Sequence, residues 1–130
     1  MTIEKKRQEC INHLYGLLKN ASKCQQIEGS ILTYTNTKAD ELGIYPDDAP
    51  VAYLEIYNQK SLHLLYNIDP NSHVGNKNLI IKILTDQIDL NNIAQCEAHE
   101  LYPEQWMNII EMQRVRENLL INHKKQGTSV

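Results

Sequence analysis

Two clusters of helix-breaking residues divide the 130-residue chain into segments whose apolar residues recur at helical spacing. In the first cluster, Gly43 is placed to end a helix, Asp48 to cap the next one and Pro50 to lie in its first turn. In the second cluster, Pro70 lacks an amide hydrogen and pushes Asp69 out of the α region, so no helix can continue through it. Few segments alternate as strands do, and the chain is therefore predicted to be helical.

The predicted helices cover most of the chain. They are residues 3–20, 24–42, 50–66, 76–84, 90–95 and 103–122. The short apolar run 79–84 would also fit a buried strand, but no second strand is available to pair with it. Asp89 is predicted to cap the segment that follows, and Pro103 to open the last helix. We expect an all-α fold, a helical bundle with extra short helices.

Composition narrows the classes of protein that the chain can belong to. Hydrophobic residues make up 42% and charged residues 22%, which are ordinary values for a globular domain. No apolar run approaches the ~20 residues that cross a bilayer, and the three cysteines are widely spaced, so we expect an intracellular protein without a membrane partner. A net charge of −3 argues against a dominant phosphate-binding face, so any contact with nucleic acid is expected to be indirect.

The sequence contains no nucleophile motif, no glycine-rich phosphate loop and no paired Cys-x-x-Cys, and we therefore expect no enzyme. Cys96 and His99 have the spacing of half a zinc site that His73 could approach, but four converging ligands are needed, so a core thiol beside a surface imidazole is favoured. Asp69 and Asn71 begin like a calcium loop, although a helix-ending Asx turn accounts for them better. We expect no metal or cofactor in this chain.

Basic residues gather late in the chain. Arg114, Arg116, Lys124 and Lys125 lie on and after the last predicted helix. They fit equally a solvated face, where cations suit a helix C-terminus, and a docking surface. Trp106 fits a core contact or an anchor for a partner.

A series of motifs between Tyr53 and Leu101 follows a recognisable order. It consists of Tyr57, Asn67, Asp69-Pro70, Leu79, Ile83-Leu84, Gln87-Ile88, Ile93 and Glu100-Leu101. This order and spacing resemble the central domain of transcription elongation factor S-II, and the likeness extends more weakly from about Arg7 to Val130. A polar loop after Pro70 is three residues longer than in the family, and Leu62 and His63 stand where the family is commonly basic.

The resemblance implies a helical bundle of the S-II central-domain type that docks on a multisubunit DNA-dependent RNA polymerase. In the family, such a domain positions a zinc ribbon whose acidic hairpin promotes cleavage of backtracked RNA. Residues 123–130 resemble the linker to that ribbon, so we expect a domain at 1–122 and a linker or frayed tail at 123–130. We also expect the sequence to be a piece of a longer factor, in which the absent ribbon would hold the zinc. A divergent viral member is our expectation, located in the nucleus if cellular and in the host cytoplasm or nucleus if viral.

The resemblance also gives candidate contacts with the polymerase. They are Lys60, Arg114, Arg116, Lys124 and Lys125. Two alternatives stay open: an interaction module that docks on polymerase without a ribbon, and a helical adaptor unrelated to transcription. We expect a monomer, with a homodimer through the first helix and its Leu17-Leu18 pair as the alternative.

Overall fold

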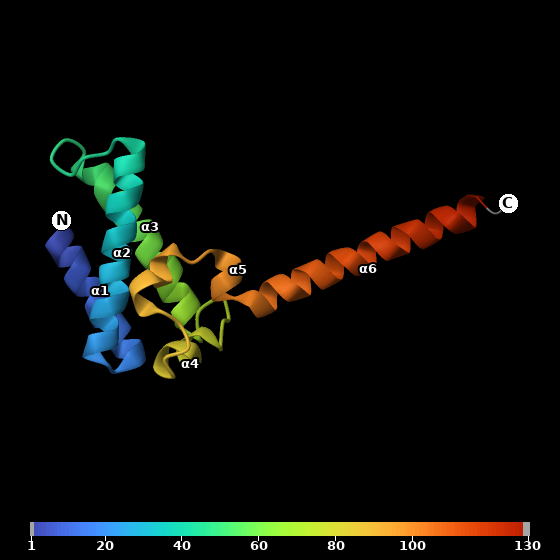
Figure 1. Cartoon of the computed structure of the whole chain (residues 1–130), viewed down its shortest axis with the longest axis horizontal. Helices are drawn as coiled ribbons and strands as arrows, with labels where there is room; N and C mark the ends of the chain where they lie inside the picture. Colours follow the sequence, from blue (N-terminus) through green and yellow to red (C-terminus); the bar gives the residue numbers. More distant parts are fainter. Residues whose placement is uncertain (1, 129–130) are drawn as a thin grey trace. The chain divides into compact units, whose positions relative to one another are not determined.

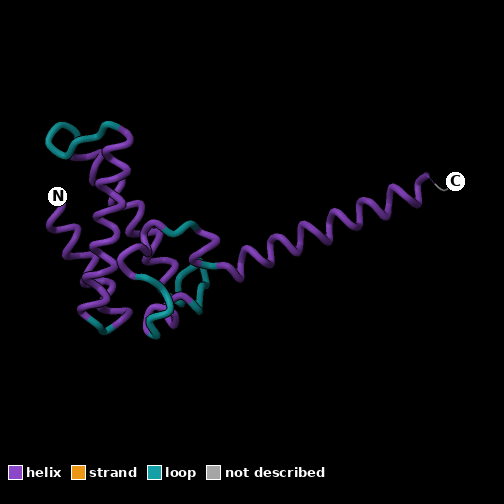
Figure 2. The backbone as a smooth tube through the Cα atoms, in the orientation of Figure 1, coloured by secondary structure: helices purple, strands orange, loops and turns teal. Residues whose placement is uncertain are grey.

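The computed structural model describes residues 2–128, and side chains within that range up to Ile121. It is all-helical: 77% of the chain is helix, and the described residues form no strand (Figures 1 and 2). The elements in chain order are α1 (Ile3–Leu18), α2 (Ala21–Leu42), α3 (Pro50–Ile68), α4 (Leu79–Leu84), the 3-10 helix η1 (Leu90–Gln95), α5 (Ala98–Leu101) and α6 (Pro103–Thr128). The predicted all-α class is confirmed.

The chain divides into two units, Met1–Cys96 and Glu97–Val130. The domain expected at 1–122 covers the first unit and most of the second, and its boundary stays a prediction. The second unit consists of α5 and α6, and α6 continues to Thr128, through most of the segment predicted as a linker or frayed tail at 123–130. The helix can continue because residues 123–128 contain no proline, and Lys and Gln are good helix formers.

In the first unit, α1, α2 and α3 lie side by side, and α2 contacts α1, α3 and η1 (Figure 1). The largest fully buried side chains of this unit come from all of these helices and from α4. They include Leu14, Ile27, Ile31, Tyr57, Leu64, Ile68, Leu79, Ile83 and Ile93. α2 therefore forms the centre of the core, with its apolar residues shared among three neighbours.

The first breaker cluster works as predicted at two of its three positions. Gly43 ends α2 with a left-handed φ of 69°, and Pro50 is the first residue of α3. The prediction that Asp48 caps α3 is wrong, because Ala49 stands at the N-cap and no side chain bonds there. The N–H groups of Asp48 and Ala49 both donate to the carbonyl of Tyr45, and this turn places Asp48 one residue too early to cap.

The second cluster contains the predicted Asx turn, in which Asp69 Oδ1 accepts the N–H of Asn71 at 2.9 Å. The helix assigned to the ambiguous apolar run is confirmed, but α4 begins at Leu79 rather than near Asn76. It starts later because Asn76 Oδ1 accepts the N–H of Leu79 at 3.2 Å. Asp89 caps η1 as predicted by accepting the N–H of Asn91 at 3.0 Å.

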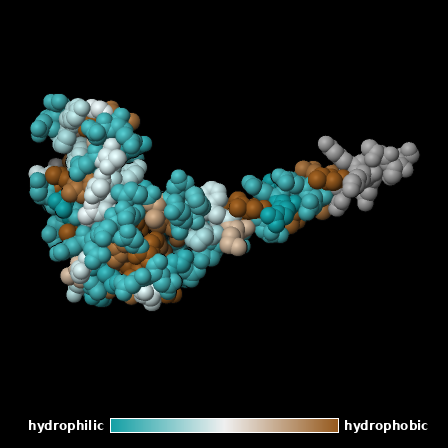
Figure 3. All heavy atoms as spheres, in the orientation of Figure 1, coloured by the Kyte–Doolittle hydropathy of each residue, from teal (hydrophilic) through white to brown (hydrophobic). Residues whose placement is uncertain are grey.

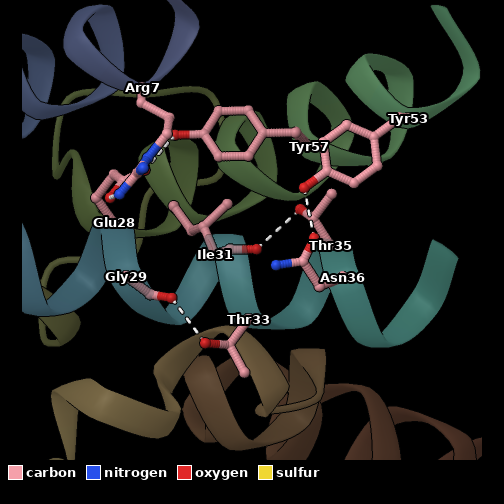
Figure 4. Close-up of polar contacts among 9 residues, drawn as sticks. All are labelled: Arg7, Glu28, Gly29, Ile31, Thr33, Thr35, Asn36, Tyr53 and Tyr57. Carbon is pink, nitrogen blue, oxygen red and sulfur yellow. Dashed lines mark hydrogen bonds and ion pairs between the residues drawn. The ribbon is translucent and has the colours of Figure 1, made fainter. Parts of the chain in front are cut away.

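An ion pair with a buried carboxylate joins the first three helices (Figure 4). Glu28 of α2 is 2% exposed, and its carboxylate accepts from Arg7 Nε of α1 at 2.6 Å and from Arg7 Nη2 at 3.0 Å. Tyr57 of α3 donates its hydroxyl to Glu28 Oε1 at 3.1 Å. Nearby, Tyr53 donates to Asn36 Oδ1. A buried carboxylate is tolerated only where such donors surround it, so these contacts fix how α1, α2 and α3 pack together.

Cys10 lies beside Tyr57 in this cluster and is 5% exposed. Burial raises the pKa of the Cys10 thiol to about 11. At pH 8 this leaves roughly 0.1% thiolate, against about a quarter for an ordinary thiol with a pKa near 8.5. We therefore expect iodoacetamide to alkylate native Cys10 at least 100-fold more slowly than Cys10 of the urea-unfolded chain, as measured by peptide mass spectrometry.

The pH dependence of this reaction has a definite sign. Between pH 8 and 10 the alkylation rate of native Cys10 should rise about tenfold per unit, because each unit multiplies its thiolate tenfold below a pKa of about 11. The unfolded thiol ionises first, so the contribution of Cys10 to stability is complete below pH ~8.5 and is lost as the pH rises toward 11. Equal rates for native and unfolded Cys10 at pH 8 would contradict the buried, neutral thiol.

Candidate functional site

A surface pocket of about 300 Å³ lies between α2 and α3 in the first unit. This volume is at the lower end of the range for ligand pockets. Its lining residues are Tyr34, Lys38 and Leu42 from α2, and Ile56, Gln59, Lys60 and His63 from α3. The α2 positions are four residues apart, and on α3 the adjacent pair Gln59 and Lys60 lies three or four residues from Ile56 and from His63, so each set lies on one face of its helix. We call this the α2–α3 pocket.

The lining of the α2–α3 pocket is cationic. Lys60 Nζ lies 4.2 Å from the centroid of the Tyr34 ring, within the range of a cation–π contact. Burial lowers the pKa of Lys60 from its ordinary value. Lys38 is at 3.8 Å from Glu41, a half-exposed pair that solvent screens. None of the residues that line the pocket carries a carboxylate, so an anionic group would meet net positive charge there.

His63 adds an unsatisfied polar atom to the same wall. Its Nδ1 is buried and has no hydrogen-bond partner among the described residues. Burial, and secondarily the charge of Lys60, lowers the pKa of His63, so the imidazole is neutral at pH 7. A buried ring nitrogen without a partner costs free energy, and a ligand group that bonds to it would remove that cost.

These features together favour a particular chemistry. Leu42 and Ile56 supply apolar surface, and Lys38 and Lys60 supply two ammonium groups. Such a lining fits a carboxylate carried on an apolar stem, such as an acidic side chain of a partner protein.

The second candidate surface is on α6, where every described side chain from Gln105 to Ile121 is exposed. Nine large apolar residues of this segment are 38–68% exposed, and Figure 3 shows brown apolar atoms next to teal polar ones along the helix. They are Trp106, Met107, Ile109, Ile110, Met112, Val115, Leu119, Leu120 and Ile121. We call this set the α6 surface. Contiguous exposed apolar patches mark interaction sites in soluble proteins.

Trp106 lies at the start of the α6 surface. It is 40% exposed, and its ring stands edge-on to that of His99 of α5, with the centroids 6.3 Å apart. Trp106 was expected to be either a core contact or an anchor for a partner. In the structure it makes a partial contact within its own unit, and a large part of the indole stays accessible.

The predicted polymerase contacts fall in both units. Arg114 and Arg116 are both exposed on α6, two residues apart, and Arg114 Nη1 is 3.8 Å from Glu111 Oε2. Lys60 lines the α2–α3 pocket. The backbone at Lys124 and Lys125 is part of α6, but their side chains lie outside the described residues.

Sequence reasoning found one pocket residue, Lys60, and missed Tyr34, Lys38 and His63. The spacing of residues 34, 38 and 42 was the available signal, because it places them on one helical face. Two cations on separate helices meet only when those helices pack, and no local pattern in the sequence reports that packing.

Other features of the described residues bear on the class of the site. No group of three or more His, Cys, Asp or Glu side chains in this part of the chain could hold a metal ion. None of the described helices is both long and apolar enough to cross a membrane. No protein-family model, curated protein or solved structure matches the chain.

Proposed function

We propose that this chain is a protein-interaction module of the S-II central-domain type, which docks on a multisubunit DNA-dependent RNA polymerase and positions a downstream zinc ribbon. The observation that carries the proposal is the α6 surface, where Arg114 and Arg116 stand among exposed apolar side chains. Arginine and large apolar residues are enriched at protein interfaces. The identity of the partner rests on the sequence resemblance.

The placement of the resemblance motifs supports this proposal. Tyr57, Leu79, Ile83 and Ile93 are each at most 1% exposed. The side-chain amide of Asn67 donates to the carbonyl of His63 at 2.9 Å near the end of α3. These positions therefore hold the first unit together, as motif positions of a shared fold would. They leave the docking contacts to exposed residues outside the motif.

The mechanism would be tethering rather than catalysis. Docking holds the ribbon near the polymerase channel and raises its effective concentration there. The α2–α3 pocket would receive an acidic side chain of the polymerase between Lys38 and Lys60. Zinc and the acidic hairpin belong to the ribbon, so the chain alone is expected to bind polymerase without stimulating RNA cleavage.

Charge reversal on α6 tests this proposal. The variant Arg114→Glu/Arg116→Glu should bind the RNA polymerase of the organism that carries the gene at least tenfold more weakly than the wild type, because the new carboxylates would be repelled by the acidic surface that the arginines are proposed to contact. Binding is measured by pull-down and by surface plasmon resonance. Wild-type binding should also weaken between about 0.1 and about 0.5 M salt, since the Debye length shortens.

A matched control separates a local contact from overall charge. Lys5→Glu/Lys19→Glu makes the same change in net charge at exposed positions of the first unit and should bind polymerase like the wild type. If the wild type does not bind polymerase at low salt, the proposed function is wrong. An equal loss in both double variants would show that net charge, and not the α6 surface, controls binding.

The alternative, a helical adaptor unrelated to transcription or a polymerase module without a ribbon, is favoured by the apolar content of the same surface. An adaptor that binds through apolar anchors would lose its partner on Trp106→Ala, by tenfold or more, and keep it on charge reversal of the arginines. Measuring both variants against the same immobilised partner separates the two readings.

A further inference from the structure

We propose that α6 pairs in an antiparallel orientation with α6 of a second copy of this chain, so that the protein is a homodimer. This inference competes with the polymerase proposal for the same residues, because both place a partner on the α6 surface. It rests on two properties of the second unit: how much apolar surface α6 exposes, and how charge is distributed along it.

The first property is the exposure of the α6 surface. Nine large apolar residues lie in the sixteen positions from Trp106 to Ile121, and all are at least 38% exposed. A helix with apolar residues on several sides is normally covered by other structure. Most of the stability of helices in proteins comes from the packing of an apolar face rather than from helix propensity. The α6 surface therefore requires a partner.

The dimensions of α6 suit a helix of equal length. A 26-residue helix is about 39 Å long and about 10 Å wide, which gives roughly 600 Å² on one side. A standard interface takes about 800 Å² from each partner. Pairing along nearly the full helix is thus needed, and a second α6 offers the matching length.

The second property identifies the occupant. On α6, residues 103–113 carry two glutamates and no Lys or Arg, whereas residues 114–128 carry four Lys and Arg and a single glutamate. An antiparallel pair places the acidic half of each copy beside the basic half of the other. A parallel pair would place like charges together, and it would also align the helix dipoles unfavourably. Both complementary halves are present in one chain, so a second copy satisfies them.

The change from acidic to basic residues falls in the middle of the apolar segment that runs from Trp106 to Ile121. With the two-fold axis between Gln113 and Arg114, Met112 is level with Val115 of the second copy, and Glu111 is level with its Arg116. Met112, Val115 and Leu119 are spaced by three and then four residues, the spacing that brings side chains of paired helices together. Apolar and charged positions therefore favour the same orientation.

Two charge variants test the proposal by sedimentation equilibrium. On α6, Arg114→Glu/Arg116→Glu changes residues 114–128 to a net charge of −1, so that both halves are acidic, and Asn108→Lys/Glu111→Lys changes residues 103–113 to a net charge of +1, so that both halves are basic. We expect the wild type to be dimeric and each variant to raise the dimer dissociation constant at least tenfold. An equimolar mixture of the two variants should form heterodimers, because opposite charges then face each other again.

Two further variants complete the experiment. Lys5→Glu/Lys19→Glu should leave the dimer dissociation constant unchanged. Met112→Asn/Leu119→Asn removes apolar contacts but no charge of α6, and it should raise the dissociation constant at least tenfold. Circular dichroism checks that each variant is folded. A wild type that stays monomeric up to about 1 mM, where even a weak pair would form, overturns the proposal.

Other outcomes overturn the orientation or the role of charge. If both charge variants remain dimeric, charge does not set the pairing, and the antiparallel proposal fails. Failure of the mixture to form heterodimers has the same consequence. Asn108→Lys/Glu111→Lys keeps both arginines, so its binding to polymerase reports on the proposed function separately from dimerisation. A dimer that does not bind polymerase would therefore refute only the proposed function.

Discussion

Replacing Arg7 with Met is expected to lower the free energy of unfolding by about 3 kcal/mol. The Glu28 carboxylate is 2% exposed and would lose both guanidinium hydrogen bonds, while the Tyr57 hydroxyl would still donate to it. An uncompensated buried charge is among the most destabilising changes in a protein, and the partial exposure of Arg7, 41% of its side chain, moderates the loss toward the lower end of that range. Urea unfolding followed by far-ultraviolet circular dichroism measures the effect.

Two controls isolate the ion pair. Lys6→Met removes the neighbouring cation, whose pair with Glu9 is at 3.9 Å on the surface, and should change the stability by less than about 0.5 kcal/mol. Adding Glu28→Gln to Arg7→Met removes the buried charge while keeping an acceptor for Tyr57, and should recover at least about 1 kcal/mol. If Arg7→Met and Lys6→Met are equally stable, Glu28 does not depend on Arg7.

Ile93→Ala is expected to destabilise the protein by about 2 to 5 kcal/mol, although η1 is only six residues long. Ile93 is 0% exposed, so truncation loses the transfer free energy of the side chain and leaves a cavity. η1 is also held to α2 by Ser30, whose hydroxyl accepts the N–H of Ala94 at 2.9 Å and donates to Gln95 Oε1 at 3.1 Å. A 3-10 helix of this length depends on such contacts, since its own hydrogen bonds are poorly aligned.

The matched control is Ile81→Ala in α4. Ile81 is 54% exposed, so the same truncation there removes little buried surface and should cost under about 1 kcal/mol. Thermal and urea unfolding of both variants give the comparison. A cost for Ile93→Ala no larger than that for Ile81→Ala would mean that η1 is not part of the core of the first unit.

Much of the secondary structure was predictable because its determinants act within a few residues. Gly43, Pro50 and Asp89 mark helix ends or caps through their own backbone and side-chain chemistry, and the Asx turn at Asp69 is equally local. The misplaced cap at Asp48 shows the limit of such reasoning. The cap shifted by one residue because two N–H groups converge on the carbonyl of Tyr45, which depends on the path of the whole turn.

The candidate site was predictable only in part. Arg114, Arg116 and Lys60 could be selected by charge, but the pocket around Lys60 depends on how α2 packs against α3. The ion pair of Arg7 and Glu28 joins residues that are 21 apart in the chain, and nothing in the sequence indicates that these two residues pair. Pairings of this kind are set by tertiary packing and have no local signature.

The sequence by itself determined where the helices lie and that the protein is all-helical, because helix periodicity, breakers and caps are local properties of the chain. Only the tertiary structure decided which charges are buried, which cations meet in the α2–α3 pocket, and which apolar residues stay exposed on α6. The apolar periodicity of the last segment predicted a helix there, but it did not show that the apolar side chains of this helix stay exposed. The physical reason is that burial depends on what covers a helix, and that is a property of the assembled fold rather than of the helix's own residues.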